Sequence, residues 1–250
     1  RHGRHALRAP APDRAHHPAY QAKTWAMNIL ITGTTSGIGH KLAQDYLREG
    51  HTVYCCGRND AVLSKLTASF GERATSLHFD VADLNDCKQA LAAVSDLDVV
   101  ILNAGTCEYI DAKNFDAQSF ERVIRINLIG IANCLEALIP KLRAGSTLSL
   151  MGSSSSYLPL PRAEAYGASK AATEYLAKTL ALTLKNEGIH VSYIAPGFVE
   201  TPLTDLNNFP MPMLSSFSIS FLGIIPPPTS NTSIKPFSFI RFKTAGKIVI

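Results

Sequence analysis

The sequence lacks the cysteine pattern of a disulfide framework or of a zinc site. Its five cysteines are an odd number, and no two of them form a CxxC or CxxH pair. Cys55 and Cys56 lie in an apolar run, where buried reduced thiols are expected. The eight histidines show no metal-ligand spacing either. The sequence therefore predicts no metal site, and reduced thiols fit a cytoplasmic location.

A basic patch on the folded part of the chain is also lacking. The net charge of +4 comes from the two ends, because residues 1–26 and residues 211–250 each carry +4. The body between them, residues 27–210, carries −4. A nucleic-acid-binding domain needs basic side chains gathered on its own surface. No nucleic-acid partner is therefore expected.

No apolar run is typical of a signal peptide or of a membrane span. The apolar stretch 213–225 has 13 residues with serines among them, which is too short to cross a bilayer. Residues 1–26 are rich in Arg, His, Ala and Pro and show no helical or strand period. Because Met27 directly precedes the first expected strand, we expect residues 1–26 to be a disordered or non-native extension. An Arg-rich transit peptide is the alternative.

From Met27 onward, short apolar runs alternate with helical patterns. Such an alternation is typical of βαβ units that build a parallel sheet. The expected strands are 28–32, 52–56, 74–79, 98–102, 146–152 and 189–195. The expected helices are 37–49, 60–70, 82–94, 116–143 and 163–187. The pattern predicts an α/β fold with a doubly wound parallel sheet and three layers over residues 27–212.

The composition changes abruptly after about residue 212. Residues 211–250 contain no Asp or Glu, but five prolines and seven serines, and they show no clear helical period. We expect residues 213–250 to be an atypical tail with an incomplete last helix and strand, from replaced or divergent sequence. An uncovered sheet edge there would favour aggregation.

The segment "TGTTSGIG", residues 32–39, lies between the first expected strand and the first expected helix. Its glycines permit a tight turn and the close approach of a ligand to the backbone. A helix N-terminus offers unpaired N–H groups and a partial positive charge to a pyrophosphate. The segment therefore predicts a dinucleotide-binding loop.

Further segments follow in order on the expected elements: "FDV" at 79–81, "LNAG" at 102–105, "INLIG" at 126–130, "YGASK" at 166–170 and "PGFVET" at 196–201. Together with TGxxxGxG, they resemble the short-chain dehydrogenase/reductase family, in its branch of about 250 residues. The resemblance covers about residues 27–205. It implies a Rossmann dinucleotide-binding and catalytic domain, a homodimer or homotetramer, and a set of cofactor contacts. These contacts are Gly33, Thr35, Ser36, Gly37, Ile38, Gly39, Asp80, Val81, Asn103, Ala104, Gly105, Tyr166, Lys170, Pro196, Gly197, Val199 and Thr201.

The second expected strand ends in "CCGRN", without the acidic residue that usually binds the ribose hydroxyls of NAD. Gly57 stands there, and Arg58 follows. A guanidinium at this point would pair with a 2′-phosphate. The sequence therefore favours NADP(H) over NAD(H), although an exposed loop arginine is the alternative.

Three side chains carry the expected chemistry. Tyr166 and Lys170 are four residues apart, so on a helix they share one face. A nearby ammonium, together with an oxidised nicotinamide, is expected to lower the pKa of the phenol toward neutrality. Ser153 stands thirteen residues before Tyr166 and is expected to hydrogen-bond the substrate oxygen, with Ser154 as the alternative.

The resemblance adds a role for each residue. It implies that Tyr166 donates a proton to the carbonyl oxygen during reduction and that Lys170 also holds the nicotinamide ribose. It further implies that Asn127 maintains a water relay to the lysine, that Thr201 holds the carboxamide and that Asp80 lies near the adenine.

The substrate side is less defined. A group of apolar residues in the loops is expected to form either an apolar wall or part of the core: Leu158, Leu160, Phe198, Leu203 and Phe209. This favours a small carbonyl or alcohol substrate. Two other functions stay open: a non-catalytic NADP(H)-binding sensor or scaffold, and an epimerase or dehydratase, whose usual TGxxGxxG spacing the chain lacks.

Overall fold

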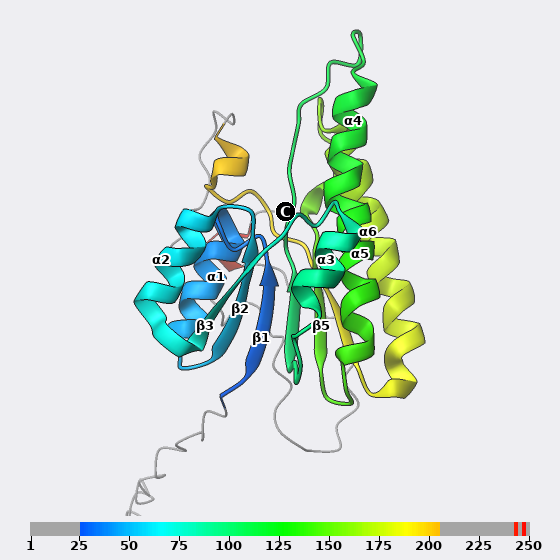
Figure 1. Cartoon of the computed structure of the whole chain (residues 1–250). Coiled ribbons are helices and arrows are strands. Elements are labelled where there is room, and N and C mark those ends of the chain that lie inside the picture. The colour runs from blue at the N-terminus through cyan, green and yellow to red at the C-terminus, as the bar shows by residue number, and fades with distance from the viewer. Residues whose placement is uncertain (1–25, 206–242, 245–246, 249–250) are drawn as a thin grey trace, which may run out of the picture.

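The computed structural model describes residues 26–205, 243–244 and 247–248 (Figure 1). The expectations for the extension 1–26 and for the tail 213–250 fall almost wholly outside these residues. Two short strands from the tail are described, β7 (Lys243–Thr244) and β8 (Lys247–Ile248), and they form an antiparallel pair with each other.

The main sheet is parallel throughout and has the strand order β3-β2-β1-β4-β5-β6 in the described part of the chain. Its strands are β1 (Asn28–Thr32), β2 (Thr52–Gly57), β3 (Ala74–His78), β4 (Val99–Leu102), β5 (Thr147–Met151) and β6 (His190–Ile194). The order reverses between β1 and β4, which is where open α/β sheets form a ligand crevice. The predicted doubly wound sheet is confirmed.

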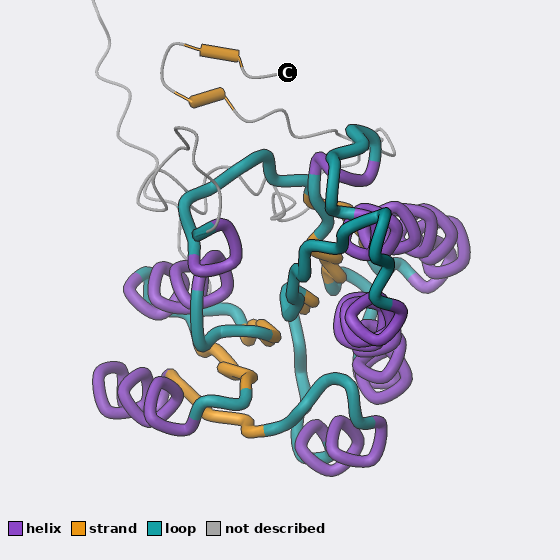
Figure 2. The backbone as a smooth tube through the Cα atoms, turned by 90° about the horizontal axis from the view of Figure 1, so that it is seen from above, coloured by secondary structure: helices purple, strands orange, loops and turns teal. Residues whose placement is uncertain are grey.

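Helices cover both faces of this sheet (Figures 1 and 2). One face carries α1 (Gly37–Arg48) and α2 (Asp60–Phe70), which pack on it in one core cluster. The other face carries α3 (Leu84–Leu91), α4 (Ala117–Ile124), α5 (Gly130–Leu138) and α6 (Glu164–Thr183). The three layers are as predicted.

The uninterrupted apolar runs reflect burial on both faces of the sheet. In β1, Ile29 and Ile31 join the core under α1 and α2, whereas Leu30 joins the core under α3 and α5. The same alternation separates Cys55 from Cys56 in β2, and both thiols are buried as predicted. Side chains alternate between faces along a strand, so only apolar residues fit a strand that is covered twice.

Polar side chains at the helix N-termini begin several helices. The Asn59 side chain accepts a hydrogen bond from the Val62 N–H at the start of α2. Asp83 and Asp116 do the same at the starts of α3 and α4. These caps satisfy N–H groups that have no partner within the helix.

The predicted long helix over 116–143 is observed as the continuous helical stretch Ala117–Lys141, but this stretch is not α-helical throughout. A π-helical segment, Arg125–Ile129, lies between α4 and α5, and a 3₁₀ turn, Ile139–Lys141, follows α5. The apolar period continues through the segment, so the sequence pattern alone does not reveal it. Such π segments are frequent at functional sites.

The stretch Ala117–Lys141 has 25 residues and contains an 18-residue window with a mean hydropathy of 1.5, so by length and composition alone it could cross a membrane. In the fold it packs inward through buried residues that include Val123, Cys134 and Leu138. A core helix of a folded domain passes the same test.

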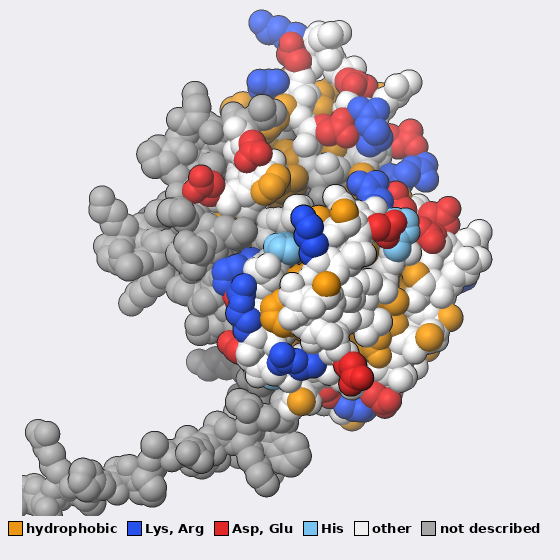
Figure 3. All heavy atoms as spheres, turned by 60° about the vertical axis from the view of Figure 1, so that its left-hand side comes forward, with side chains coloured by type: hydrophobic (Ala, Val, Ile, Leu, Met, Phe, Trp, Pro, Cys, Tyr) orange, Lys and Arg blue, Asp and Glu red, His pale blue; other side chains and the backbone are white. Residues whose placement is uncertain are grey.

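Charged side chains of both signs are interspersed on the face of the molecule shown in Figure 3. Within α1, Arg48 lies 3.2 Å from Asp45. Exposed pairs of this kind contribute little to stability.

Candidate active site

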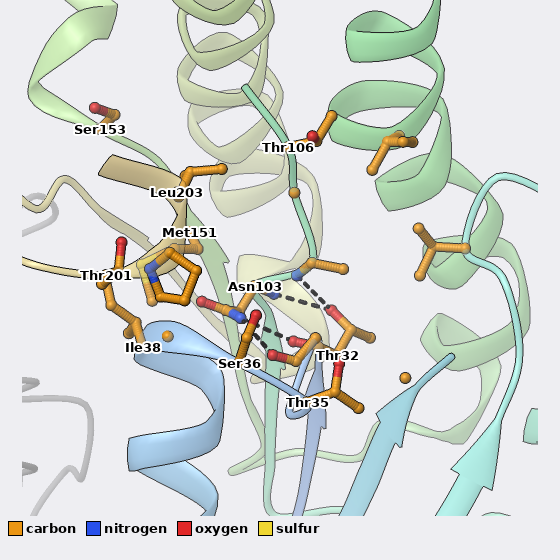
Figure 4. Close-up of a pocket in the computed structure, with 18 of the residues that line it drawn as sticks. Thr32, Thr35, Ser36, Ile38, Asn103, Thr106, Met151, Ser153, Thr201 and Leu203 are labelled. Carbon is orange, nitrogen blue, oxygen red and sulfur yellow. Dashed lines mark hydrogen bonds between the residues drawn. The ribbon is translucent and has the colours of Figure 1, made fainter. Parts of the chain in front are cut away.

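A cavity of about 390 Å³ opens at the carboxyl ends of the strands. Figure 4 shows Thr35 and Ser36 of the glycine-rich loop at one end of it and Ser153 at the other. All predicted site residues line this cavity except Gly39 and Asn127. Lining residues that the sequence reasoning did not assign are Thr32, Cys56, Gly57, Phe79, Thr106, Ile126, Met151, Gly152, Pro202 and Thr204.

The glycine-rich loop depends on three glycines. Gly33 and Gly37 have positive φ angles of 73° and 53°, which residues with a side chain rarely adopt. Gly39 has ordinary φ, but a Cβ there would lie 2.2 Å from the Gly33 carbonyl oxygen and 2.4 Å from Asn103 Nδ2. Gly39, in the first turn of α1, therefore permits the close packing of the loop on this helix. It does not line the cavity itself.

Asn103 holds this loop from the end of β4 (Figure 4). Its Nδ2 donates to the carbonyl oxygens of Thr32 at 3.0 Å and Gly33 at 3.3 Å. The Thr32 hydroxyl in turn accepts from the backbone N–H groups of Asn103 and Ala104. The Asn103 amide thus supports the cradle, and the loop presents its own backbone to a ligand.

The helix N-terminus that follows the loop faces the same cavity. Ser36 is the N-cap of α1, with extended backbone and no capping hydrogen bond from its side chain. The first N–H groups of α1 have no partner within the helix and suit an anion such as a pyrophosphate. The predicted phosphate contacts at Thr35, Ser36 and Gly37 lie together here.

The end of the cavity that holds the glycine-rich loop also carries the charged pair Arg58 and Asp80. Arg58 Nη1 lies 3.1 Å from Asp80 Oδ2, and the side chains are 65% and 38% exposed. A Cβ at Gly57 would lie 2.6 Å from Thr35 Cγ2, so an acidic residue does not fit at that position without rearrangement. The guanidinium is therefore the charge that this end of the cavity offers to a ligand, with the Asp80 carboxylate beside it.

Val81 is supported from behind by α5. Asn133 Nδ2 donates to the Val81 carbonyl oxygen at 2.9 Å. A Cβ at Gly130 would lie 2.8 Å from Val81 Cγ2. Both supporting residues act through Val81 and not through a ligand contact of their own, which is why the sequence reasoning missed their roles.

Ser153 follows β5 after one residue, Gly152, and is buried. It begins the turn Ser154–Ser156, and its Oγ accepts from the Ser155 N–H at 3.2 Å. Ser153 lines the cavity and Ser154 does not. Of the two alternatives, Ser153 is therefore the one placed to contact a ligand in the cavity, and its catalytic role stays a prediction.

Tyr166 and Lys170 lie on one face of α6 and both line the cavity, as predicted. Lys170 Nζ lies 5.5 Å from the centroid of the Tyr166 ring. The same Nζ donates to the Met151 carbonyl oxygen at 2.9 Å, which ties α6 to the end of β5. Lys170 is 4% exposed, so its charge is held inside the protein.

Burial shifts both pKa values. It raises the pKa of Tyr166 to about 12, and a hydrogen bond with Ser153 offsets only part of this effect. It lowers the pKa of Lys170 from 10.5 to about 8. Burial is thus the largest influence on the Tyr166 pKa in the protein by itself, and a lowering of that pKa by Lys170 together with an oxidised nicotinamide stays a prediction.

Asn127 lies in the π-helical segment, fully buried and behind the cavity. Its Oδ1 accepts from the Thr106 N–H at 2.7 Å, and its Nδ2 donates to the Thr106 carbonyl oxygen and to Ser169 Oγ. These bonds fix the segment after β4 against α6. The water relay at Asn127 stays a prediction.

The segment after β6 closes one side of the cavity. Thr204 Oγ1 donates to the Val199 carbonyl oxygen at 2.7 Å, and the Thr201 N–H donates to Thr204 Oγ1 at 3.0 Å. Of the expected apolar wall, Leu203 lines the cavity, whereas Leu158, Leu160 and Phe198 do not. Phe209 lies outside the described residues.

Comparisons with known proteins agree with this geometry. The family model described as "short chain dehydrogenase" matches residues 27–209. Serine 3-dehydrogenase of Rhizobium radiobacter is 32% identical over 183 residues, which cover 70% of this chain and 73% of that protein.

Two solved structures have the same fold. The first is a short chain dehydrogenase from Burkholderia cenocepacia in complex with NADP, with a TM-score of 0.71, 22% identity and coverage of 76% of this chain and 80% of that one. The second is the 3-ketoacyl-(acyl-carrier-protein) reductase from Brucella melitensis complexed with NADH, with a TM-score of 0.66, 25% identity and coverage of 71% and 77%. The chain belongs to the short chain dehydrogenase family, whose members are oxidoreductases with a Rossmann fold.

Proposed function

We propose that the protein transfers a hydride between NADP(H) and a small carbonyl or alcohol substrate, with Tyr166 as the general acid and base. The observation that carries this proposal is the meeting of Ser153, Tyr166 and Lys170 at one end of a cavity whose other end is a glycine-rich loop at a helix N-terminus. Relatives support the reaction class, because a serine 3-dehydrogenase is among them.

The residues present fit a dinucleotide. The cradle leaves no room for side chains at Gly39 and Gly57, and α1 directs unpaired N–H groups at the phosphate position. A bound nicotinamide would supply or accept the hydride. Thr35, Ser36 and Gly37 would hold its phosphates, and Thr201 would lie toward its carboxamide.

The protein's own part of the chemistry is a proton transfer. The half-buried Tyr166 phenol, whose pKa is raised to about 12, is fully protonated at neutral pH, which suits the donation of a proton to a carbonyl oxygen. Ser153 orients that oxygen by a hydrogen bond. The Lys170 ammonium stabilises the phenolate that is left. In the direction of alcohol oxidation, the same phenolate accepts the proton.

We favour NADP(H) because Arg58 is the cation at the ribose end of the cavity and no acid stands at position 57. One structural neighbour holds NADP and another holds NADH, so the neighbours do not decide between the two cofactors. The substrate class rests on Leu203 at the cavity wall and on the modest cavity volume of about 390 Å³.

The test is a steady-state assay of NADPH and NADH oxidation against a panel of small ketones and aldehydes, with the matching alcohols in reverse. We expect turnover with NADPH for at least one substrate, and a loss of about 10²- to 10⁴-fold in Tyr166→Phe with cofactor binding retained. Cofactor binding without turnover of any substrate would support the sensor alternative and contradict the proposal.

A further inference from the structure

Position 152, directly before Ser153, is a glycine whose space is filled by a side chain from the neighbouring strand. A Cβ at Gly152 would lie 2.0 to 2.2 Å from the Cζ, Cε2 and Oη atoms of Tyr193. Tyr193 belongs to β6, where it pairs with Leu150 of β5. Because only glycine permits this approach, the end of β5 and the Tyr193 ring are matched in shape.

The Tyr193 hydroxyl lies among backbone groups of two elements. Its oxygen accepts a hydrogen bond from the Ser153 N–H at 3.2 Å. Its O–H faces the carbonyl oxygens of Ser153 at 3.4 Å and of Lys170 at 3.3 Å. A phenol has one hydrogen to donate, so the two carbonyls share it. One side chain of β6 thus connects the residue after β5 with α6.

The same stretch of backbone is held on its other side by Lys170. Lys170 Nζ donates to the Met151 carbonyl oxygen at 2.9 Å, and the Gly152 N–H donates to the Ile194 carbonyl oxygen at 2.6 Å. The backbone from Met151 to Ser153 is therefore fixed between α6 and β6. Tyr193 supplies the last of these contacts, at the residue that carries the catalytic hydroxyl.

We propose that Tyr193 is a positioning residue of the active site: its hydroxyl fixes the backbone of Ser153 relative to Lys170 and thereby places Ser153 Oγ. Tyr193 does not line the cavity, so it acts through Ser153 and not on the substrate. This inference rests on the proposed function, because the placement of Ser153 Oγ affects turnover only if that hydroxyl orients a reacting oxygen. Small misplacements of such groups cost large factors in rate.

The variant that tests this is Tyr193→Phe, which removes one oxygen and keeps the ring in the space beside Gly152. We expect kcat for the best substrate of the panel to fall about 10-fold, the usual scale for a buried N–H left without its acceptor. The KM for NADPH should stay within about twofold, because the cradle lies on other strands. The matched control is Tyr46→Phe, which also removes a buried phenol oxygen, but in α1. It should leave kcat unchanged.

A double-mutant cycle separates positioning from a general loss of stability. In a Ser153→Ala background there is no Oγ left to place, so Tyr193→Phe should lower the single-turnover rate by less than about twofold. The same 10-fold loss in both backgrounds would overturn the proposal. A kcat of Tyr193→Phe equal to that of Tyr46→Phe would overturn it as well.

A second measurement does not depend on turnover. Amide hydrogen exchange at the Ser153 N–H, followed by NMR, should be faster in Tyr193→Phe than in the wild type and unchanged in Tyr46→Phe. If the wild type turns over no substrate, the proposed function fails, and this exchange rate alone decides on the positioning by Tyr193. Unchanged protection of the Ser153 N–H in Tyr193→Phe would refute that positioning.

Discussion

The two ends of the cavity differ in the residues that line them and in how exposed these residues are to solvent. Around β1, β2 and β4, the cavity wall includes the glycine-rich loop with the small polar side chains Thr35 and Ser36, and its charged side chains Arg58 and Asp80 are exposed to solvent. Around β5, α6 and β6, the wall includes two titratable side chains, Tyr166 and Lys170, of which Lys170 is only 4% exposed.

This difference separates binding from chemistry. At the glycine-rich end, the shape of the backbone controls binding, because an added Cβ at Gly39 would lie only 2.2 Å from the Gly33 carbonyl oxygen. At the other end, desolvation decides, since burial moves the pKa values of Tyr166 and Lys170 in opposite directions. Substitutions at the glycine-rich end should therefore weaken cofactor binding, whereas substitutions at the other end should lower turnover.

The largest effect is expected at Lys170. Lys170→Met keeps the length of the side chain and removes its charge, so turnover should fall about 1,000-fold through loss of phenolate stabilisation. Because a buried cation without a carboxylate partner costs stability, the thermal unfolding midpoint at pH 7 should rise. Activity assays and calorimetry on the same preparation measure both.

The pH dependence of that stability difference is the control. The folded pKa of Lys170, about 8, lies below its ordinary 10.5, so the unfolded chain holds this proton more tightly. The free energy of unfolding of the wild type should therefore rise, relative to that of Lys170→Met, as the pH increases from about 8 to 10.5. A constant difference between the two across this window would show that Lys170 is not desolvated.

The next largest effect is expected at the glycine-rich end. A Cβ in Gly39→Ala would lie 2.2 Å from the Gly33 carbonyl oxygen, so the loop must shift. NADPH binding, measured by fluorescence titration, should weaken about 100-fold, the upper end of an overpacking cost of about 1 to 3 kcal/mol.

The matched control for that variant is Gly50→Ala. Gly50 has a φ of 92°, but no atom lies within 4 Å of the place that an alanine methyl group would take, so alanine adds backbone strain without a collision. It should lower the unfolding midpoint and leave NADPH affinity intact. Equal affinity losses in both variants would mean that the cradle geometry does not govern binding.

A smaller effect is expected at Arg58. Arg58→Ala should lower kcat/KM for NADPH about 10-fold and leave that for NADH nearly unchanged, through loss of one charge-assisted contact with a 2′-phosphate. Arg48→Ala is the matched control, since Arg48 is also exposed and ion-paired but lies on α1 outside the cavity lining. If kcat/KM falls equally for NADPH and for NADH in Arg58→Ala, the proposed preference for NADP(H) is wrong.

The strand positions and the cradle were predictable because their causes are local. Apolar runs such as residues 28–32 must be strands buried on both faces, and the glycines at 33, 37 and 39 precede a helix. The spacing of Tyr166 and Lys170 on a helix fixes their common face without any tertiary information.

Other features depend on contacts between distant segments. The π-helical segment around Asn127 leaves the apolar period intact, so no sequence pattern marks it. The contact of Tyr193 with Ser153 depends on the register of β6 on β5 and on the missing side chain at Gly152. The direction of the Tyr166 pKa depends on how deeply α6 is covered, which the sequence does not reveal.

The central claim is that burial keeps the Tyr166 phenol protonated in the protein by itself. It is tested most directly by an alkaline titration of tyrosinate absorbance, taken as the difference between wild type and Tyr166→Phe. We predict no tyrosinate from Tyr166 below pH 10 while the protein stays folded, since its pKa is raised from 10.0 to about 12. A tyrosinate signal from Tyr166 in the folded protein between pH 7 and 9 would contradict the account and restore the ammonium of Lys170 as the dominant influence.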